Sequence, residues 1–237
     1  MARQRLAGQV AIITGAGRGI GKAIAQSLAS EGVHTVLTSR TVPEIDAVAE
    51  AIRESGGKAT AIAADVSDQQ QVEGVVSGAL KLTGAIDILV NNAGVGIFKS
   101  VSELSVEDFD AMWNVNMRGV FLATKAVLPT MIRANAGAIV NIASLAAKNT
   151  FKGGAGYCAT KWGLRGFAGS LMLEVRDYNI RVVTICPGSV DTNFSPMNKK
   201  GATITQPEDV AEAVVFAVTA PGRSMFSEID VRPTRPV

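Results

Sequence analysis

Short apolar runs that alternate with longer helical segments are the feature that most constrains the fold of this chain. Runs rich in valine and isoleucine have the length and composition of buried parallel strands: they are Val10–Thr14, Thr35–Ser39, Thr60–Ala64, Ile86–Asn91, Ala138–Ala143 and Arg181–Cys186. Segments with helical spacing lie between and after them: Gly21–Glu31, Pro43–Ser55, Gln69–Leu82, Val106–Arg133, Tyr157–Tyr178 and Pro207–Thr219. This alternation predicts an α/β fold built on a doubly wound parallel sheet.

The connections between parallel strands fix where a ligand would bind. Because such crossovers are right-handed, helices cover both faces of the sheet and the ligand crevice lies at the carboxyl ends of the strands. No internal repeat, low-complexity tract or linker interrupts the pattern. We therefore predict that residues 1–237 form a single domain of the Rossmann type.

Composition and charge narrow the choice of partners. Hydrophobic residues make up 47% of the chain, charged residues 19%, and the formal net charge is +2. These values disfavour disorder and an obligate nucleic-acid binder, so we expect a small-molecule substrate and a homo-oligomer. No segment approaches the roughly 18 uninterrupted apolar residues of a membrane span. The opening MARQRLAG lacks a signal peptide's apolar core, and the two cysteines form no CxxC pair, so we expect a cytoplasmic protein.

The single histidine of the chain argues against two further kinds of site. His34 is the only histidine, and it opens an apolar run with no carboxylate or cysteine cluster beside it. We therefore expect neither a histidine-based triad nor a Cys/His metal site.

A glycine-rich loop, TGAGRGIGK, follows the first predicted strand and leads into an alanine-rich helix. A strand, a glycine loop and a helix amino end together form an anion site: backbone N–H groups point outward, the helix dipole favours negative charge, and glycine permits close approach. The loop therefore indicates a phosphate-bearing ligand, with a merely structural tight turn as the alternative.

The spacing of the glycines decides which ligand fits. A nucleoside-triphosphate loop would need glycine at Ala16 and Ser or Thr at Ala23, so that chemistry is disfavoured. The literal pattern GxGxxG also fails, because its last glycine would fall at Ile20 or Lys22. What remains is TGxxxGxG, with Gly15, Gly19 and Gly21.

The end of the second strand bears on the choice between NADPH and NADH. An acidic residue there normally accepts a bond from the adenosine 2′-OH, but this run ends Thr38-Ser39-Arg40. Arg40, together with Arg18 of the glycine loop, could grip a 2′-phosphate through charge-assisted bonds. This predicts NADPH/NADP+; the alternative is that both arginines are solvated surface charges. Asp65, which precedes Val66, could accept a hydrogen bond from the adenine amino group. The alternative is that Asp65 is an ordinary loop residue with no role in binding.

Tyr157 and Lys161 lie four residues apart, on one face of a predicted helix. A free tyrosine with a pKa of ~10 is a poor base at neutral pH, but a nearby cation lowers the pKa of a phenol. Such a tyrosine could give its proton to a carbonyl oxygen as a nicotinamide delivers hydride. Ser144 ends the run AIVNIAS at a strand's carboxyl end and could donate to the same oxygen. By itself the spacing also fits an ordinary helix-surface pair.

Several motifs occur together and in one order: TGAGRGIG, NNAG from Asn91, NVN ending at Asn116, Ser144, YCATK and PGSVDT from Pro187. In this combination the sequence resembles the short-chain dehydrogenase/reductase family over nearly its whole length. Within that family it is similar to bacterial 3-oxoacyl-carrier-protein reductases and carbonyl reductases.

The resemblance implies a role for each matching residue. Tyr157 would be the acid–base residue and Ser144 would stabilise the substrate oxygen. Lys161 would bind the nicotinamide ribose and lower the pKa of Tyr157, and Asn116 would hold a water that links Lys161 to solvent. The segment from Asn91 to Gly94 would flank the cofactor and support the sheet. The full predicted cofactor set is Gly15, Arg18, Gly19, Ile20, Gly21, Ser39, Arg40, Asp65, Val66, Asn92, Ala93, Gly94, Tyr157, Lys161, Pro187, Gly188, Val190 and Thr192.

The chain departs from the family pattern in three places. It ends SEIDVRPTRPV instead of a glycine-rich segment, so we expect one subunit contact to differ, and we still expect pairing through the helices Val106–Arg133 and Tyr157–Tyr178. The segment Asn193–Thr205 resembles a short lid over the substrate. Asn135 and Tyr178 stand where similar carrier-protein reductases place arginine, which weakens the carrier-protein interpretation, although Arg133 and Arg176 are close by.

The sequence leaves more than one function open. The leading hypothesis is an NADPH-dependent reductase of a ketone or aldehyde, with Tyr157 as general acid. One alternative is an NAD-dependent alcohol dehydrogenase, against which Ser39-Arg40 argues. Another is a non-catalytic NADP-binding regulator, which the presence of Ser144, Tyr157 and Lys161 disfavours. No sequence feature identifies the physiological substrate, the face of hydride delivery, the direction of the reaction or the size of the oligomer.

Overall fold

A single parallel sheet forms the centre of the protein. The computed structural model describes residues 5–194, 201 and 203–235. Seven strands pair in the order β3-β2-β1-β4-β5-β6-β7, and every pairing is parallel. The strands are β1 (Val10–Thr14), β2 (His34–Thr38), β3 (Lys58–Ala61), β4 (Ile88–Asn91), β5 (Gly137–Ile142), β6 (Ile180–Pro187) and β7 (Glu228–Val231). The predicted doubly wound α/β fold is confirmed.

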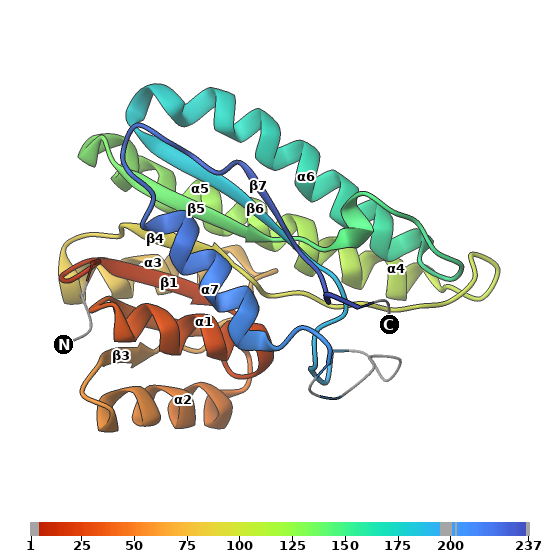
Figure 1. Cartoon of the computed structure of the whole chain (residues 1–237), viewed down its shortest axis with the longest axis horizontal. Helices are drawn as coiled ribbons and strands as arrows, with labels where there is room; N and C mark the ends of the chain where they lie inside the picture. The colour runs from red at the N-terminus through yellow and green to blue at the C-terminus, as the bar shows by residue number, and fades with distance from the viewer. Residues whose placement is uncertain (1–4, 195–200, 202, 236–237) are drawn as a thin grey trace.

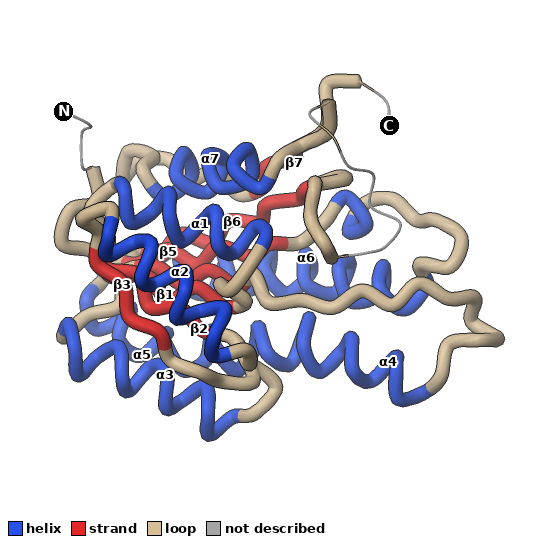
Figure 2. The backbone as a smooth tube through the Cα atoms, turned by 90° about the horizontal axis from the view of Figure 1, so that it is seen from below, coloured by secondary structure: helices blue, strands red, loops and turns tan. Residues whose placement is uncertain are grey.

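Helices cover both faces of this sheet. Figure 2 shows α1, α2 and α7 on one side of the strands and α3, α4, α5 and α6 on the other; in Figure 1, α1 and α7 lie side by side. Their bounds are α1 (Gly19–Ser30), α2 (Val42–Glu54), α3 (Gln69–Thr83), α4 (Val106–Trp113), α5 (Gly119–Ala134), α6 (Ala155–Val175) and α7 (Pro207–Val218). Among the described residues, none of the helices is long and apolar enough to cross a membrane.

Two hydrophobic cores separate the helices from the sheet. Because successive strand residues face opposite sides, Ala11 and Ile13 pack with α1, α2 and α7, whereas Val10 and Ile12 pack with α3, α5 and α6. Both faces of β1 are therefore apolar, which explains the continuous apolar run in the sequence. Burial on both sides holds the carboxyl end of β1, where the glycine loop begins, in a fixed place.

The long helix predicted over Val106–Arg133 is interrupted. The structure has α4, then a single π-helical turn η1 (Asn114–Arg118), then α5. A π turn inserts an extra residue and leaves the apolar spacing on either side nearly unchanged, so periodicity did not reveal it. Asn116, a predicted site residue, lies in this turn and is buried.

Two other expectations differ from the structure. The third strand was expected at Thr60–Ala64 but spans Lys58–Ala61, although backbone bonds from Ile62 N–H to Leu37 O and from Ala64 N–H to Ser39 O continue beyond it. Strand β7 was not predicted. The expected lid over Asn193–Thr205 lies in part outside the described residues, which exclude 195–200 and 202.

Candidate active site

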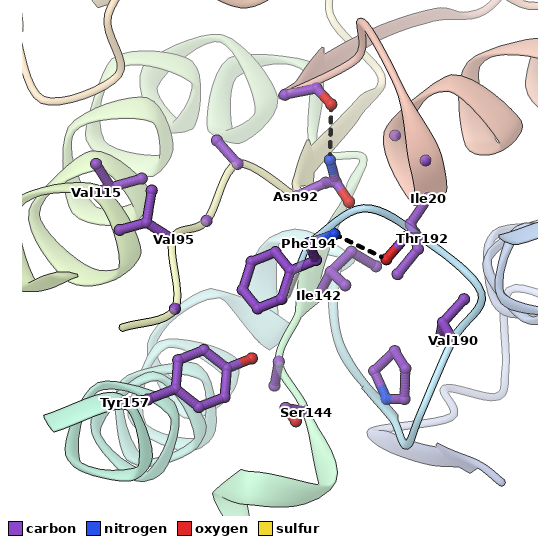
Figure 3. A pocket seen from close by; sticks show the side chains of 18 of the residues that line it. Ile20, Asn92, Val95, Val115, Ile142, Ser144, Tyr157, Val190, Thr192 and Phe194 are labelled. Atoms are coloured by element: carbon purple, nitrogen blue, oxygen red, sulfur yellow. Dashed lines mark hydrogen bonds between the residues drawn. The ribbon is translucent and has the colours of Figure 1, made fainter. Parts of the chain in front are cut away.

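A large pocket opens at the carboxyl ends of the strands, near the point where β1 is flanked by β2 on one side and β4 on the other. Its volume of about 1020 Å³ lies at the upper end of the range for ligand sites. Every predicted cofactor-binding residue lines it, as do Ser144, Tyr157 and Lys161. Figure 3 shows Tyr157 from α6, Ser144 after β5 and Ile20 of α1 around the same space.

The glycine loop is closed against the NNAG segment. Gly15 and Gly19 have φ of +65° and +52°, a region that favours glycine. A Cβ on Gly21 would overlap the carbonyl oxygen of Gly15 and lie 2.5 Å from Asn92 Nδ2. A Cβ on Gly15 would lie 2.9 Å from the Cα of Ala93. The backbone can therefore run this close only with glycine at these positions.

Thr14 and Asn92 hold these two segments together. The Thr14 hydroxyl donates to the Val90 carbonyl and accepts from the N–H groups of Asn92 and Ala93, each at 3.0 Å. Asn92 Nδ2 donates to the carbonyls of Thr14 and Gly15, at 2.9 and 3.0 Å. Asn92 thus orients the floor of the pocket from the protein side.

The amino end of α1 fits an anionic group. Its N-cap residue, Arg18, makes no side-chain capping bond, and the first turn holds no acidic residue. The first N–H groups of a helix need partners, and the helix dipole favours an anion there. A dinucleotide pyrophosphate would supply those partners, so the donor set fits a nicotinamide dinucleotide.

Both predicted phosphate-binding arginines face a carboxylate across this part of the pocket. Arg18 NH1 lies 3.8 Å from Glu44 Oε1, and Arg40 NH1 lies 3.8 Å from Asp65 Oδ2. The arginine side chains are 75% and 68% exposed, so these ion pairs are weak. The guanidinium groups can therefore turn toward a phosphate at little cost.

The carboxylate of Asp65 is held by its own turn. Asp65 Oδ1 accepts from the Ser67 N–H at 2.9 Å and from the Ser67 hydroxyl at 2.7 Å. Burial would raise the pKa of Asp65, but these bonds and the charge of Arg40 outweigh it and lower the pKa. Asp65 is therefore ionised at neutral pH and remains an acceptor at the pocket wall.

Tyr157 is buried at the amino end of α6 and contacts two phenylalanine rings. Its ring centroid lies 5.3 Å from that of Phe98 and 5.9 Å from that of Phe194. Burial raises the pKa of Tyr157 to about 12, although a hydrogen bond with Ser144 opposes the rise. Burial therefore outweighs the lowering expected from Lys161, and the role of Lys161 stays a prediction. The phenol is neutral at neutral pH and is thus a proton donor.

Lys161 lies behind Tyr157 and points at a backbone carbonyl. Its Nζ donates to Ile142 O at 3.0 Å and is 5.7 Å from the Tyr157 ring centroid. Burial lowers the pKa of Lys161 to about 8. When the free protein is titrated, Lys161 loses its proton near pH 8, before the phenol titrates, so it carries no charge that could offset the burial of the phenol.

Ser144 sits where β5 gives way to the 3-10 turn η2 (Leu145–Ala147). Its hydroxyl oxygen accepts from the Ala146 N–H at 3.1 Å and caps that turn. The bond fixes the serine rotamer and leaves the hydroxyl proton for another acceptor.

Two predicted residues lie outside the pocket. Asn116 is buried behind Val95: its Oδ1 accepts from the Val95 N–H, and its Nδ2 donates to Val95 O and to the Thr160 hydroxyl. Asn91 is buried in the sheet, where its amide donates to Asn141 Oδ1 at 2.9 Å and does not flank the pocket. The Asn116 amide therefore holds Val95 of the pocket wall in place, whereas the Asn91 amide ties β4 to β5.

The segment after β6 closes one side of the pocket. The Gly188 N–H bonds to Val231 O, and the Asp191 N–H bonds to Thr205 O at 2.9 Å. The side chain of Thr192 lies 3.3 Å from where a Cβ on Gly19 would be. These contacts place Pro187, Gly188, Val190 and Thr192 along the pocket.

Some pocket residues were not predicted. Glu44 lies near the amino end of α2, and Phe98, Phe151 and Phe194 lie on loops around Tyr157. The phenylalanines carry no periodic signal because loops have none. Glu44 comes directly after Pro43 at a predicted helix start, next to Arg40, and this position was a usable signal.

Known proteins match the chain over nearly its full length. A family model described as short chain dehydrogenase matches residues 9–202. Sepiapterin reductase of Chlorobaculum tepidum is 38% identical, over 95% of this chain and 96% of the relative. A metagenomic short-chain oxidoreductase in complex with NADP is 39% identical, with a TM-score of 0.88 over 98% of this chain and 100% of that chain. A 3-ketoacyl-ACP reductase from Sinorhizobium meliloti is 33% identical, with a TM-score of 0.87 over 94% and 96%. The chain therefore belongs to the short chain dehydrogenase family and is an oxidoreductase.

Proposed function

We propose that this protein reduces a ketone or aldehyde to an alcohol with NADPH, and that Tyr157 is the general acid. The observation that carries the proposal is the buried, protonated phenol of Tyr157, which shares one pocket with Ser144, Lys161 and an uncapped helix end suited to a dinucleotide. A proton donor beside a hydride source is the arrangement that carbonyl reduction needs.

The protein's side chains would protonate the substrate oxygen and stabilise the negative charge that develops on it. Bound NADPH would supply the hydride. Tyr157 would give its phenol proton to the carbonyl oxygen, and the Ser144 hydroxyl would donate a hydrogen bond to the same oxygen as charge develops. The ammonium of Lys161 would stabilise the phenolate that remains. Its pKa of about 8 lies close enough to neutral for Lys161 to pass a proton back.

The protonated phenol of Tyr157 is the form that donates a proton in carbonyl reduction, whereas alcohol oxidation would need the phenolate as base. The alternative of an NAD-dependent alcohol dehydrogenase is disfavoured by Ser39 and Arg40, which line the pocket where an acidic residue would bind the ribose of NAD. The intact set of Ser144, Tyr157 and Lys161 likewise supports an enzyme over a non-catalytic regulator.

NADPH is proposed over NADH because Arg18 and Arg40 flank the pocket where the second strand ends. The metagenomic relative in complex with NADP supports the same choice. Glu44 is the one observation that favours NADH, since a carboxylate beside Gly17 would repel a 2′-phosphate. The guanidinium charges of Arg18 and Arg40 oppose that repulsion.

A carrier-protein substrate is a weaker proposal. Arg133 and Arg176 are exposed at the carboxyl ends of α5 and α6, and they precede β5 and β6. They therefore lie at the amino edge of the sheet, whereas the pocket lies at the carboxyl edge. A carrier bound at these arginines would not face the pocket of the same chain.

We also propose that the chain forms a homo-oligomer through α5 and α6. Phe121 on α5 and Trp162 and Leu173 on α6 are 47%, 46% and 63% exposed. Large exposed apolar side chains on surface helices are typical of subunit contacts. Sedimentation velocity of the wild type and of Trp162→Glu tests this: the variant should dissociate, and a monomeric wild type would contradict the proposal.

The test of the proposed function compares NADPH with NADH oxidation against an acetoacetyl thioester, a diketone, an aromatic aldehyde and a cyclic ketone. We expect turnover that requires NADPH. Arg40→Ala should weaken NADPH binding by about 10- to 100-fold, the value of a charge-assisted bond, and leave NADH binding unchanged. Tighter binding of NADH than of NADPH by the wild type would contradict the cofactor assignment, and binding without any turnover would favour the regulator.

A further inference from the structure

Three phenylalanine rings line the end of the pocket that contains Tyr157. The centroid of Phe98 lies 5.7 Å from that of Phe151 and 5.3 Å from that of Tyr157, and Tyr157 lies 5.9 Å from Phe194. Figure 3 shows the rings of Tyr157 and Phe194 as neighbours in the pocket. The ring planes are inclined by 53° to 77°, as aromatic contacts prefer.

Phe98 packs against a small hydrophobic cluster around Tyr157 and Met112, whereas Phe151 and Phe194 are largely exposed. Phe98, Phe151 and Phe194 come from three separate loops, after β4, η2 and β6 respectively. Phe151 is 45% exposed and Phe194 is 42% exposed. Exposed ring area costs free energy in water, and in this protein it is gathered at the mouth of a pocket, where a ligand would cover it.

The backbone is shaped around the rings. A Cβ on Gly96 would lie 2.8 Å from Phe194 Cε1 and 2.9 Å from Phe98 Cζ. A Cβ on Gly154 would lie 2.6 Å from Phe151 Cζ. A side chain at Gly96 or Gly154 would therefore displace these rings, so both glycines support their observed places.

The surroundings of the rings carry little charge. The neighbouring lining residues Val95, Leu145, Asn149 and Thr150 are apolar or uncharged. Nearby, the ammonium of Lys161 is directed at Ile142 O, and the carboxylate of Asp191 accepts from the Gly201 N–H. Within the described residues, this end of the pocket suits a neutral, apolar group beside Tyr157.

We propose that the substrate is a neutral aldehyde or ketone whose carbonyl carbon is bonded directly to a planar aromatic ring, and that Phe98, Phe151 and Phe194 select it. The inference rests on the proposed function. The carbonyl carbon would gain a hydride, and with it two electrons, from NADPH, and the oxygen would gain the Tyr157 proton, so the products are the aromatic alcohol and NADP+. A flat aromatic ring gains the edge and face contacts that its quadrupole favours with this wall, whereas a saturated ring packs there by apolar contact alone.

The test uses two aldehydes of similar size, benzaldehyde and cyclohexanecarbaldehyde. The ratio of their kcat/KM values with NADPH should favour benzaldehyde in the wild type. In Phe151→Leu and in Phe194→Leu the ratio should fall about 3- to 10-fold, as expected for a lost aromatic pair. Phe216→Leu is the matched control, because Phe216 stacks on Phe226 and is not part of the pocket; its ratio should not change. A ratio that stays within twofold in both pocket variants would overturn the proposal.

A binding measurement separates this inference from the proposed function. Titration calorimetry with benzyl alcohol and cyclohexylmethanol, in the presence of NADP+, needs no turnover. Preference for benzyl alcohol that is lost in Phe151→Leu supports the aromatic site, even if neither aldehyde is reduced and the reductase proposal fails. Turnover of both aldehydes with no preference in rate or binding leaves the reductase proposal intact and refutes the aromatic site.

Discussion

Lys161 is expected to lower the stability of the folded protein. It is 4% exposed, and burial lowers its pKa from 10.5 to about 8. A charged lysine that is harder to protonate in the folded state than in the unfolded chain reduces stability. Replacing it by methionine, which is apolar and similar in length, should therefore stabilise the protein while removing a proposed catalytic residue.

The expected gain follows from the pKa. The fall from 10.5 to about 8 corresponds to about 3 kcal/mol at neutral pH. The variant also loses the bond from Nζ to Ile142 O, which is worth about 1 kcal/mol. Lys161→Met should thus be more stable by about 2 kcal/mol. For a domain of this size that raises Tm by about 4–8 °C.

The stability difference between the wild type and Lys161→Met should depend on pH. Below pH 8 the lysine is protonated in both states, so its destabilisation is fully present. Between pH 8 and 10.5 the unfolded chain still binds a proton that the folded protein has released, so wild-type stability rises with pH. The advantage of Lys161→Met should shrink by about 2 kcal/mol between pH 7 and 9.5. The raised pKa of Tyr157 acts above pH 10, where it favours unfolding in both proteins.

Urea unfolding of wild type and Lys161→Met at pH 7 and pH 9.5, without cofactor, tests both claims. Equal m-values would show that the free energies are comparable. Carbonyl reduction should be lost in the variant, since stabilising a functional position commonly costs activity. A variant less stable than the wild type at pH 7, or a difference that does not change with pH, would refute the argument.

Two further predictions concern the cofactor loop and the sheet edge. Gly21→Ala should destabilise the protein by about 1–3 kcal/mol and abolish NADPH binding. Gly74→Ala is the control, because a Cβ at Gly74 meets no atom within 4 Å, and it should stabilise the protein by up to about 1 kcal/mol. Equal shifts of Tm in the two variants would contradict this prediction. Lys148 Nζ lies 2.5 Å from both Glu228 and Asp230 on β7, so Lys148→Met should cost about 1–2 kcal/mol at pH 7. The difference should diminish as acid protonates the two carboxyls, whose pKa values are lowered in the folded protein; a loss that persists at pH 3 in thermal unfolding would point to another cause.

The elements with strong local patterns could be predicted from the sequence. β1 was predicted with its observed bounds, since Val10–Thr14 is apolar on both faces and stops at a glycine loop. β7 was missed because EIDV is short, half charged and only partly buried. It forms through pairing with β6 and through ion pairs from Lys148 and Arg165, which are distant in sequence.

The chemistry of the site could be predicted in kind but not in detail. Residue types and order placed Ser144, Tyr157 and Lys161 in one pocket, and their roles stay predictions. The direction of the Tyr157 pKa could not be derived, because it depends on burial and not on spacing. The wall formed by Phe98, Phe151 and Phe194 was also missed, because it is assembled from separate loops.

The central claim, that Tyr157 supplies the proton for carbonyl reduction, is tested most directly by Tyr157→Phe. NADPH oxidation with the best carbonyl substrate and the Kd for NADPH are measured together, with Tyr178→Phe as the control, because it changes the only other tyrosine, an exposed residue. The account predicts that Tyr157→Phe loses turnover by at least about 10²-fold and binds NADPH nearly as the wild type does, while Tyr178→Phe retains both. Turnover that persists in Tyr157→Phe would contradict it.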